Sequence, residues 1–233
     1  MTYSVTDLRA INTCLASVGQ APVTTVTVDS SNSEIYDPDP PTNPNVAMVW
    51  NAIQEVSREV QSEGWTFNTE NHFPINVNGS NQIEVPANVL QMELTDDWWT
   101  FDRNRAVETN AIEKTYTPDA VMRDNGGTAM MYDKANHTYL WNYNPTYFDM
   151  IWLRNFDEVP PIVLDFIVAR AASLCALRML GDGTQYQLLQ QRELYCRAQA
   201  MQYETSQGDY SYFGAPPGGF HYRGYQPFQT LSR

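Results

Sequence analysis

The run of residues 160–180, PPIVLDFIVARAASLCALRML, constrains the fold most, because it is the most strongly apolar segment of the chain. Its two leading prolines suit the first turn of a helix, where a missing N–H costs nothing. Gly181 directly follows the run, as expected of a glycine that ends a helix. Apolar residues cover more than one face, and Asp165 and Arg170 argue against a membrane span. The run therefore predicts the central helix of a bundle.

Three other segments have the apolar periodicity of helices that would pack on this central one. Residues 4–18 and 44–63 place apolar side chains three and four positions apart, and each segment is followed by glycine. Residues 184–207 come after the tight turn Gly181-Asp182-Gly183, and such a short connection makes two helices antiparallel neighbours. The sequence thus predicts one helix pair near each end of the chain.

Residues 65–158 differ in character, because apolar and polar residues alternate there as in half-buried strands. Alternation around 73–77 and 83–85 flanks the turn signal Asn78-Gly79, and strands are also expected at 139–141 and 150–153. The sequence predicts an α+β chain in which a small antiparallel β domain is inserted into a four-helix bundle. Its expected parts are an N-terminal helix pair (1–64), the β domain (65–158), a C-terminal helix pair (159–207) and an extended tail (208–233).

The tail, residues 208–233, is too rich in glycine and proline for a long regular element, yet it is densely aromatic. Disordered segments are normally poor in aromatic residues, whereas aromatic side chains are enriched at protein interfaces. We therefore expect an arm that docks on another subunit. The alternative is that the tail folds back on its own bundle.

Charge and cysteine content exclude some classes of function. The net charge is −13, and residues 1–160 carry 22 acidic against 8 basic side chains. An acidic body argues against nucleic acid held through its phosphates, which requires clustered Lys and Arg. The three cysteines, Cys14, Cys175 and Cys196, lie far apart and indicate free thiols. The N-terminus has no secretory signal pattern, so we expect the chain to be made in the cytoplasm.

Signatures of catalysis or of cofactor binding are missing from the sequence. It contains no phosphate-binding loop, dinucleotide fingerprint or nucleophile elbow, so we expect no cofactor and no metal. The three histidines are too scattered for a local zinc motif: His72, His137 and His221. Asp96-Asp97 beside Trp98-Trp99 imitates the carboxylate pair and stacking aromatics of a glycosidase. Adjacent strand residues point to opposite faces, however, so we predict a protein that is not an enzyme.

Three passages together suggest a family: INTCLASVGQAPVTTV at 11–26, EGWTFN at 63–68, and WLRNFDEVPPIVLDFIV at 152–168. In order and spacing they resemble the tail tubular protein A family, the head–tail adaptor or gatekeeper-ring subunits of short-tailed phages. The ending Thr230-Leu231-Ser232-Arg233 is also similar to that family. The chain departs from the pattern in its long loop at 28–44 and in the polar stretch at 95–117.

This resemblance implies a dodecameric ring in the virion, between the portal protein and the tail nozzle protein (tail tubular protein B). It implies that the C-terminal arm meets the portal, that the β domain meets the nozzle, and that ejected DNA passes without specific binding. No membrane insertion is implied. The expected portal-binding residues are Tyr210, Tyr212, Phe213, Phe220, Tyr222, Tyr225, Phe228, Leu231 and Arg233. The alternative function is a virion-associated glycan hydrolase acting on the host envelope through Asp96 and Asp97.

Overall fold

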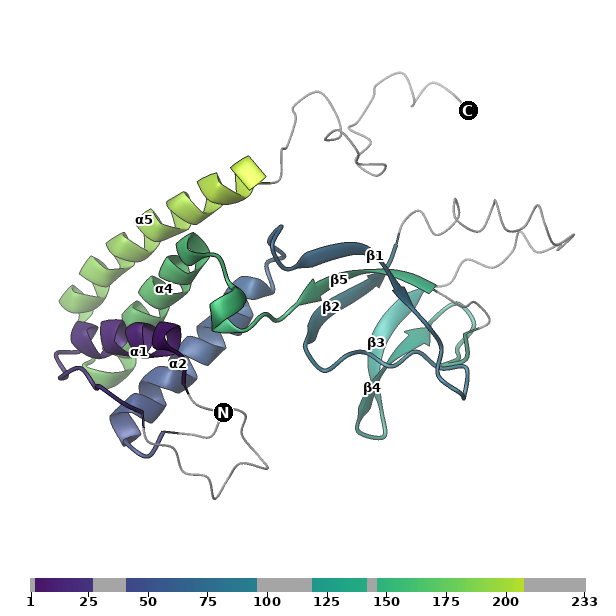
Figure 1. Ribbon diagram of the computed structural model, residues 1–233, viewed down its shortest axis with the longest axis horizontal. Helices are drawn as coiled ribbons and strands as arrows, with labels where there is room; N and C mark the ends of the chain where they lie inside the picture. Colours follow the sequence, from purple (N-terminus) through teal and green to yellow (C-terminus); the bar gives the residue numbers. More distant parts are fainter. Residues whose placement is uncertain (1–2, 27–40, 96–118, 142–145, 208–233) are drawn as a thin grey trace, which may run out of the picture. The chain divides into compact units, whose positions relative to one another are not determined.

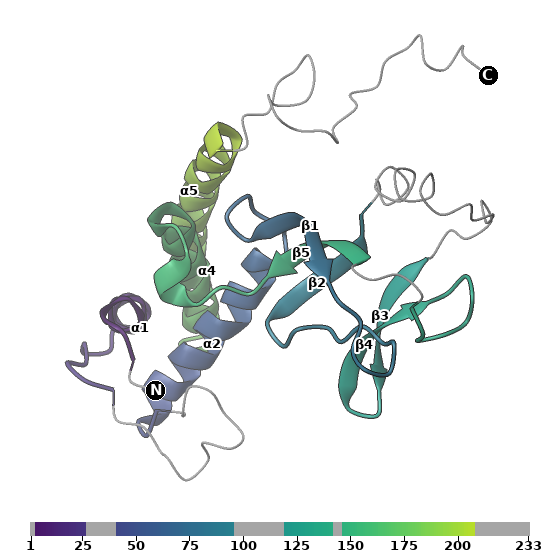
Figure 2. The same ribbon diagram turned by 45° about the vertical axis from the view of Figure 1, so that its right-hand side comes forward.

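The computed structural model describes residues 3–26, 41–95, 119–141 and 146–207, which form two compact units (Figures 1 and 2). The helical unit comprises the described residues up to Glu63 and those from Arg154 onward, and the β unit comprises those of 64–153. Within these residues there are four α-helices and two small antiparallel sheets, so the predicted α+β class is confirmed. The arrangement of the helices as a four-helix bundle and the form of the tail remain predictions.

The helices of the helical unit are α1 (Val5–Ser17), α2 (Pro44–Gln61), α4 (Pro161–Met179) and α5 (Gly183–Gln207), with a short 3-10 turn η2 (Phe156–Glu158) before α4. Helix α4 contacts all three of the other helices, and ten of its residues are buried. None of the described helices is both long and apolar enough to span a membrane. The apolar run therefore forms a helix that is packed against the other helices of the unit.

Local sequence signals explain where α1 begins and ends. The Ser4 hydroxyl accepts the Asp7 amide N–H at 3.1 Å, and the Asp7 carboxylate accepts the Ser4 N–H at 2.7 Å. This reciprocal pair is a capping box, which satisfies amide groups that the first turn leaves free. At the other end Gly19 takes a positive φ of 72°, and the next amide, of Gln20, bonds back to Leu15.

The β unit contains β1 (Thr69–Ile75), β2 (Val89–Leu94), β3 (Ala120–Asn125), β4 (Thr128–Asp133) and β5 (Thr146–Trp152). One sheet has the order β1-β5-β2 and the other is the hairpin β3-β4, and both are antiparallel. The hairpin turn has positive φ at both Gly126 and Gly127, which matches the right-handed twist of its strands. The strand prediction at 150–153 is confirmed for residues up to Trp152, which lie in β5.

Two of the predicted strands are wrong. Residues 83–85 make only an isolated bridge, from Glu84 to Met130 of β4, and residues 139–141 form a loop rather than a strand. Their alternation reflects burial of single side chains, because Ile83 and Trp141 both lie in the core without belonging to a ladder. The core of this unit consists of Ile83, Met92, Met131, Trp141, Phe148 and Met150.

All three cysteines are free and buried within the helical unit. The Cys14 thiol lies next to Cys175, and its hydrogen bond with that thiol, together with burial, raises the pKa of Cys14. Burial likewise raises the pKa of Cys196. A thiol kept protonated is a poor nucleophile, so Cys14 and Cys196 serve as packing groups.

Candidate assembly surface

The residues singled out for chemistry do not form a site in the part of the chain that the structure describes. Among those residues no group of three or more His, Cys, Asp or Glu side chains is placed to hold a metal ion. Asp96, Asp97 and the neighbouring tryptophans lie outside the described residues. The expected portal-binding residues lie outside them as well: Tyr210, Tyr212, Phe213, Phe220, Tyr222, Tyr225, Phe228, Leu231 and Arg233.

Amide side chains hold together the segments that carry the family resemblance. In the passage at 11–26, the side-chain amide of Asn12 in α1 forms hydrogen bonds with both the N–H and the carbonyl of Val23. Its Oδ1 accepts the Val23 N–H at 2.8 Å, and its Nδ2 donates to the Val23 carbonyl at 2.9 Å. This clamp fastens the segment after Gly19 against the helix that precedes it, so the passage is a structural turn.

A second amide clamp lies in the helical unit, at the end of α2. Gln61 is fully buried; its Oε1 accepts the Arg154 N–H at 2.7 Å and its Nε2 donates to the Arg154 carbonyl at 3.0 Å. Sequence analysis missed this residue, although its position offers a signal. Gln61 follows Ile53 and Ser57 at four-residue intervals, on the buried side of α2.

A third clamp lies in the β unit, within the passage EGWTFN. Asn68 is fully buried, accepts the Trp65 amide N–H at 2.9 Å and donates to the Trp152 carbonyl at 2.9 Å. Trp152 in turn donates its amide N–H to the Asn68 carbonyl at 2.8 Å. Hydrogen bonds therefore link the passage at 63–68 to the passage at 152–168. The passages at 11–26 and 63–68 thus both have a structural explanation.

Gly64 of the same passage should resist substitution. Its φ is +75°, and a Cβ there would lie 2.9 Å from the Ile151 Cδ1 atom. We expect Gly64→Ala to lower the free energy of unfolding by about 1–2 kcal/mol, from the left-handed backbone and the contact together. Gly19→Ala is the matched control, because Gly19 has φ +72° with nothing within 4 Å. Chemical denaturation of both variants measures the difference, and equal losses would exclude a role for the Ile151 contact.

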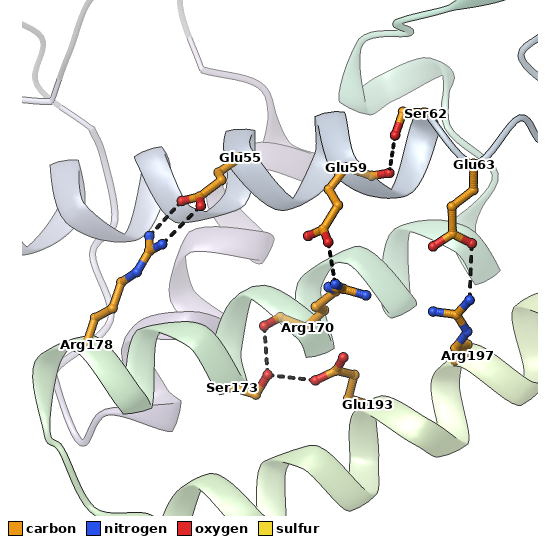
Figure 3. Close-up of polar contacts among 9 residues, drawn as sticks. All are labelled: Glu55, Glu59, Ser62, Glu63, Arg170, Ser173, Arg178, Glu193 and Arg197. Atoms are coloured by element: carbon orange, nitrogen blue, oxygen red, sulfur yellow. Dashed lines mark hydrogen bonds and ion pairs between the residues drawn. The ribbon is translucent and has the colours of Figure 1, made fainter. Parts of the chain in front are cut away.

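Ion pairs connect the helices of this unit (Figure 3). Three glutamates at four-residue intervals, two in α2 and one just beyond it, meet arginines of α4 and α5: Glu55 with Arg178, Glu59 with Arg170, and Glu63 with Arg197. The hydrogen bonds from Arg178 lower the pKa of Glu55. Because these pairs are exposed to solvent, each contributes little stability by itself. Two of them join α2 to α4, and the Glu63–Arg197 pair joins α5 to the residue just beyond α2.

The inner side of α5 is unusually polar. The Glu193 carboxylate accepts the Ser173 hydroxyl of α4 at 2.7 Å, and the Arg197 guanidinium lies 5.6 Å from the centre of the Phe166 ring. The helix has only four charged residues, and at about 100° per residue they fall on the same half as the two buried positions, Cys196 and Ala200. These charged residues are Arg192, Glu193, Arg197 and Glu204.

The outer face of α5, in contrast, is free of charge and carries exposed apolar side chains. Leu188, Leu194 and Tyr195 are 59%, 63% and 64% exposed, and Met201 is 48% exposed. We define the α5 outer face as residues Leu188, Gln191, Leu194, Tyr195, Ala198, Met201 and Gln202, which share an arc of about 140° with further uncharged residues such as Thr184, Gln187, Thr205 and Ser206. The solvent side of a surface helix is normally charged or polar, whereas exposed apolar area marks interaction sites. The α5 outer face is therefore the best candidate for an assembly surface among the described residues.

A groove of about 640 Å³ opens elsewhere on the helical unit, between α1, α4 and α5. We call it the α1–α4 groove, and its apolar lining includes Ala10, Leu164, Ala169, Ala172 and Leu189. Its charged residues are balanced, two basic and two acidic: Arg9, Arg192, Asp157 and Asp165. Such a groove has the small residues and neutral balance that suit a helix or an apolar side chain rather than an ion.

Comparison with known protein families is consistent with an assembly surface on this chain. The family model described as tail tubular protein matches residues 8–210, which include the described helices and both sheets almost completely. No curated protein matches the chain. Because the match covers most of the chain, and a tail tubular protein is a structural component of a phage virion, the resemblance of the three passages is confirmed. The chain therefore belongs to the tail tubular protein family of phage tail proteins.

Proposed function

We propose that this chain is the head–tail adaptor of a short-tailed phage, a subunit of the gatekeeper ring between the portal and the tail nozzle. The match to the tail tubular protein family over residues 8–210 carries the proposal. The exposed, uncharged outer face of α5 supports it, because a subunit that works in an assembly has a use for such a surface. The role is structural and involves no catalysis.

The proposed partners follow the order of the parts along the chain. The segment 208–233 begins directly after α5, and its aromatic residues dock on the portal protein. The residues assigned to this contact are Tyr210, Tyr212, Phe213, Phe220, Tyr222, Tyr225, Phe228, Leu231 and Arg233. The β unit meets the nozzle protein, and twelve copies close the ring.

Phage DNA passes through this ring without specific binding. A net charge of −13 repels the phosphate backbone, so a subunit of this composition favours sliding over retention. The ring completes the portal after the genome has been packaged and forms the seat for the nozzle. Ejection then requires that DNA moves through the channel, which a repulsive wall assists.

Portal binding by a truncated chain tests the proposal. The full chain and a chain ending at Gln207 are each mixed with the portal ring of the same phage and examined by native mass measurement and negative-stain imaging. We expect the full chain to join the portal and the truncated chain to fail, because the aromatic segment supplies the contact. A control that keeps the full length but carries Tyr222→Ser, Tyr225→Ser and Phe228→Ser separates aromatic contact from mere length. A full chain that ignores the portal would contradict the adaptor function, and equal binding by the truncated chain would contradict the assignment of the arm.

A further inference from the structure

We propose that the α5 outer face of one copy packs into the α1–α4 groove of a second copy. This inference rests on the proposed function, because a ring of identical subunits needs a contact between neighbours, and it names the two surfaces that make the contact. Both surfaces belong to the helical unit, so the helices alone supply the joint between neighbouring copies.

The absence of charge on the α5 outer face favours a second copy as the occupant. Two copies that each carry a net charge of −13 repel each other wherever charged surface meets charged surface. A contact between an uncharged face and a groove whose charges balance avoids that repulsion. The α5 outer face contains leucine, tyrosine, alanine, methionine and glutamine only. A partner chosen by opposite charge would instead be met by acidic residues, which this face does not have.

The inner side of α5 fixes which face is left outside. Arg197 pairs with Glu63 and covers the Phe166 ring, and Glu193 accepts the Ser173 hydroxyl. Turning the apolar face inward would break these contacts and leave the buried Ser173 hydroxyl without its glutamate acceptor. The exposed position of Leu194 and Tyr195 is thus set by the polar contacts of the same helix, and those side chains are left to be covered by another molecule.

The α1–α4 groove has the complementary shape and chemistry. Small residues of α1 and α4, among them Ala10, Ala169 and Ala172, line it and leave room for larger side chains from a neighbouring helix. Its basic and acidic residues are equal in number, so it presents no net charge to an incoming uncharged helix. The groove therefore suits the α5 outer face better than it suits a charged surface.

The two surfaces are different, which determines the symmetry of the contact. Leu189 and Arg192 of α5 line the groove, whereas Leu188 and Tyr195 lie on the outer half of the helix. Each copy therefore offers one face and one groove, and the contact is heterologous. Head-to-tail contacts of this kind generate a closed ring when the rotation between copies closes.

A matched pair of methionines tests the face. Met201 lies on the α5 outer face and Met48 lies on α2 away from it, and both are 48% exposed. We expect Met201→Glu to raise the concentration for half-assembly by about tenfold or more, because it places an unpaired charge in the contact, while Met48→Glu leaves it unchanged. Sedimentation of the full chain over a range of concentrations, alone and on the portal ring, measures this. Equal behaviour of the two variants would overturn the proposal, as would a wild-type chain that makes no contact between copies in either setting.

Mixing two variants tests the groove. Thr13 is an exposed residue of α1 that lines the groove, so Thr13→Lys should block it without disturbing the core. Each variant alone should stay monomeric at concentrations where the wild type assembles. An equal mixture of Thr13→Lys and Met201→Glu should form dimers and nothing larger, because the intact face of the first fits the intact groove of the second. A mixture as monomeric as its components would overturn the proposal.

The outcome is distinguishable from a failure of the adaptor function. If the wild-type chain assembles but does not bind the portal, the adaptor function is contradicted and the proposed contact between copies is supported. If the wild-type chain fills the portal ring and Met201→Glu fills it equally well, the adaptor function stands and this inference fails. Binding of single Met201→Glu copies to the portal, with loss of complete rings, supports both.

Discussion

Replacing Trp141 by alanine is expected to lower the free energy of unfolding of the β unit by about 3–5 kcal/mol. The side chain is 1% exposed and packs with Phe148 at a ring distance of 6.1 Å. Its indole N–H also donates to the Met131 carbonyl at 3.0 Å, which links the loop to β4. Alanine would leave a large cavity in the smaller of the two cores and an unpaired carbonyl beside it.

Hydrogen exchange followed residue by residue separates this effect from general destabilisation. We expect Trp141→Ala to accelerate exchange of the amides of β4 and β5 strongly, and chemical denaturation gives the free energy. Trp141→Phe is the control, since it keeps most of the apolar volume and removes the indole hydrogen bond, so it should cost about 1–2 kcal/mol. An unchanged exchange rate in β5 would contradict the role of Trp141 as the anchor of this core.

Trp141 also illustrates where sequence patterns mislead. An aromatic residue between other apolar residues favours a strand, yet it lies on a loop whose amide bonds to the Asn81 carbonyl rather than to a strand. The Trp141 side chain fills the core, but burial of a side chain does not require its backbone to pair in a sheet. Periodicity predicts which side chains are buried more reliably than it predicts which backbone segments pair.

The helices were predictable because each has its own signals. The predicted range 44–63 ends within two residues of Gln61, and the capping box at Ser4 and Asp7 is present as the spacing implies. Both signals depend on residues close together in the chain, so they need no knowledge of the tertiary fold.

The candidate surface on α5 could not be assigned from the sequence. Leu188 and Leu189 are neighbours and equally apolar, yet the first is 59% exposed and the second lines the groove. Both halves of this helix carry apolar residues, so periodicity does not decide between them. The decision comes from Glu63 and Ser173, remote residues that hold the charged half of α5 inward.

The amide clamp at Gln61 depends on a remote partner in the same way, and its loss should be costly. Gln61→Leu keeps the approximate size of the side chain but removes both hydrogen bonds to the Arg154 backbone. We expect the free energy of unfolding of the helical unit to fall by about 2–3 kcal/mol, because two partly buried backbone groups lose their partner. Chemical denaturation measures the loss, and hydrogen exchange at the Arg154 amide should accelerate.

Gln54→Leu is the matched control, since Gln54 lies exposed on the same helix and the chemical change is identical. It should alter the free energy of unfolding by no more than about 0.5 kcal/mol. If Gln61→Leu were equally mild, apolar packing would compensate for the lost bonds, and the clamp would not be what holds the chain as it returns to the helical unit. A large loss at position 61 alone would instead show that one buried amide fixes the backbone just before η2 against the end of α2.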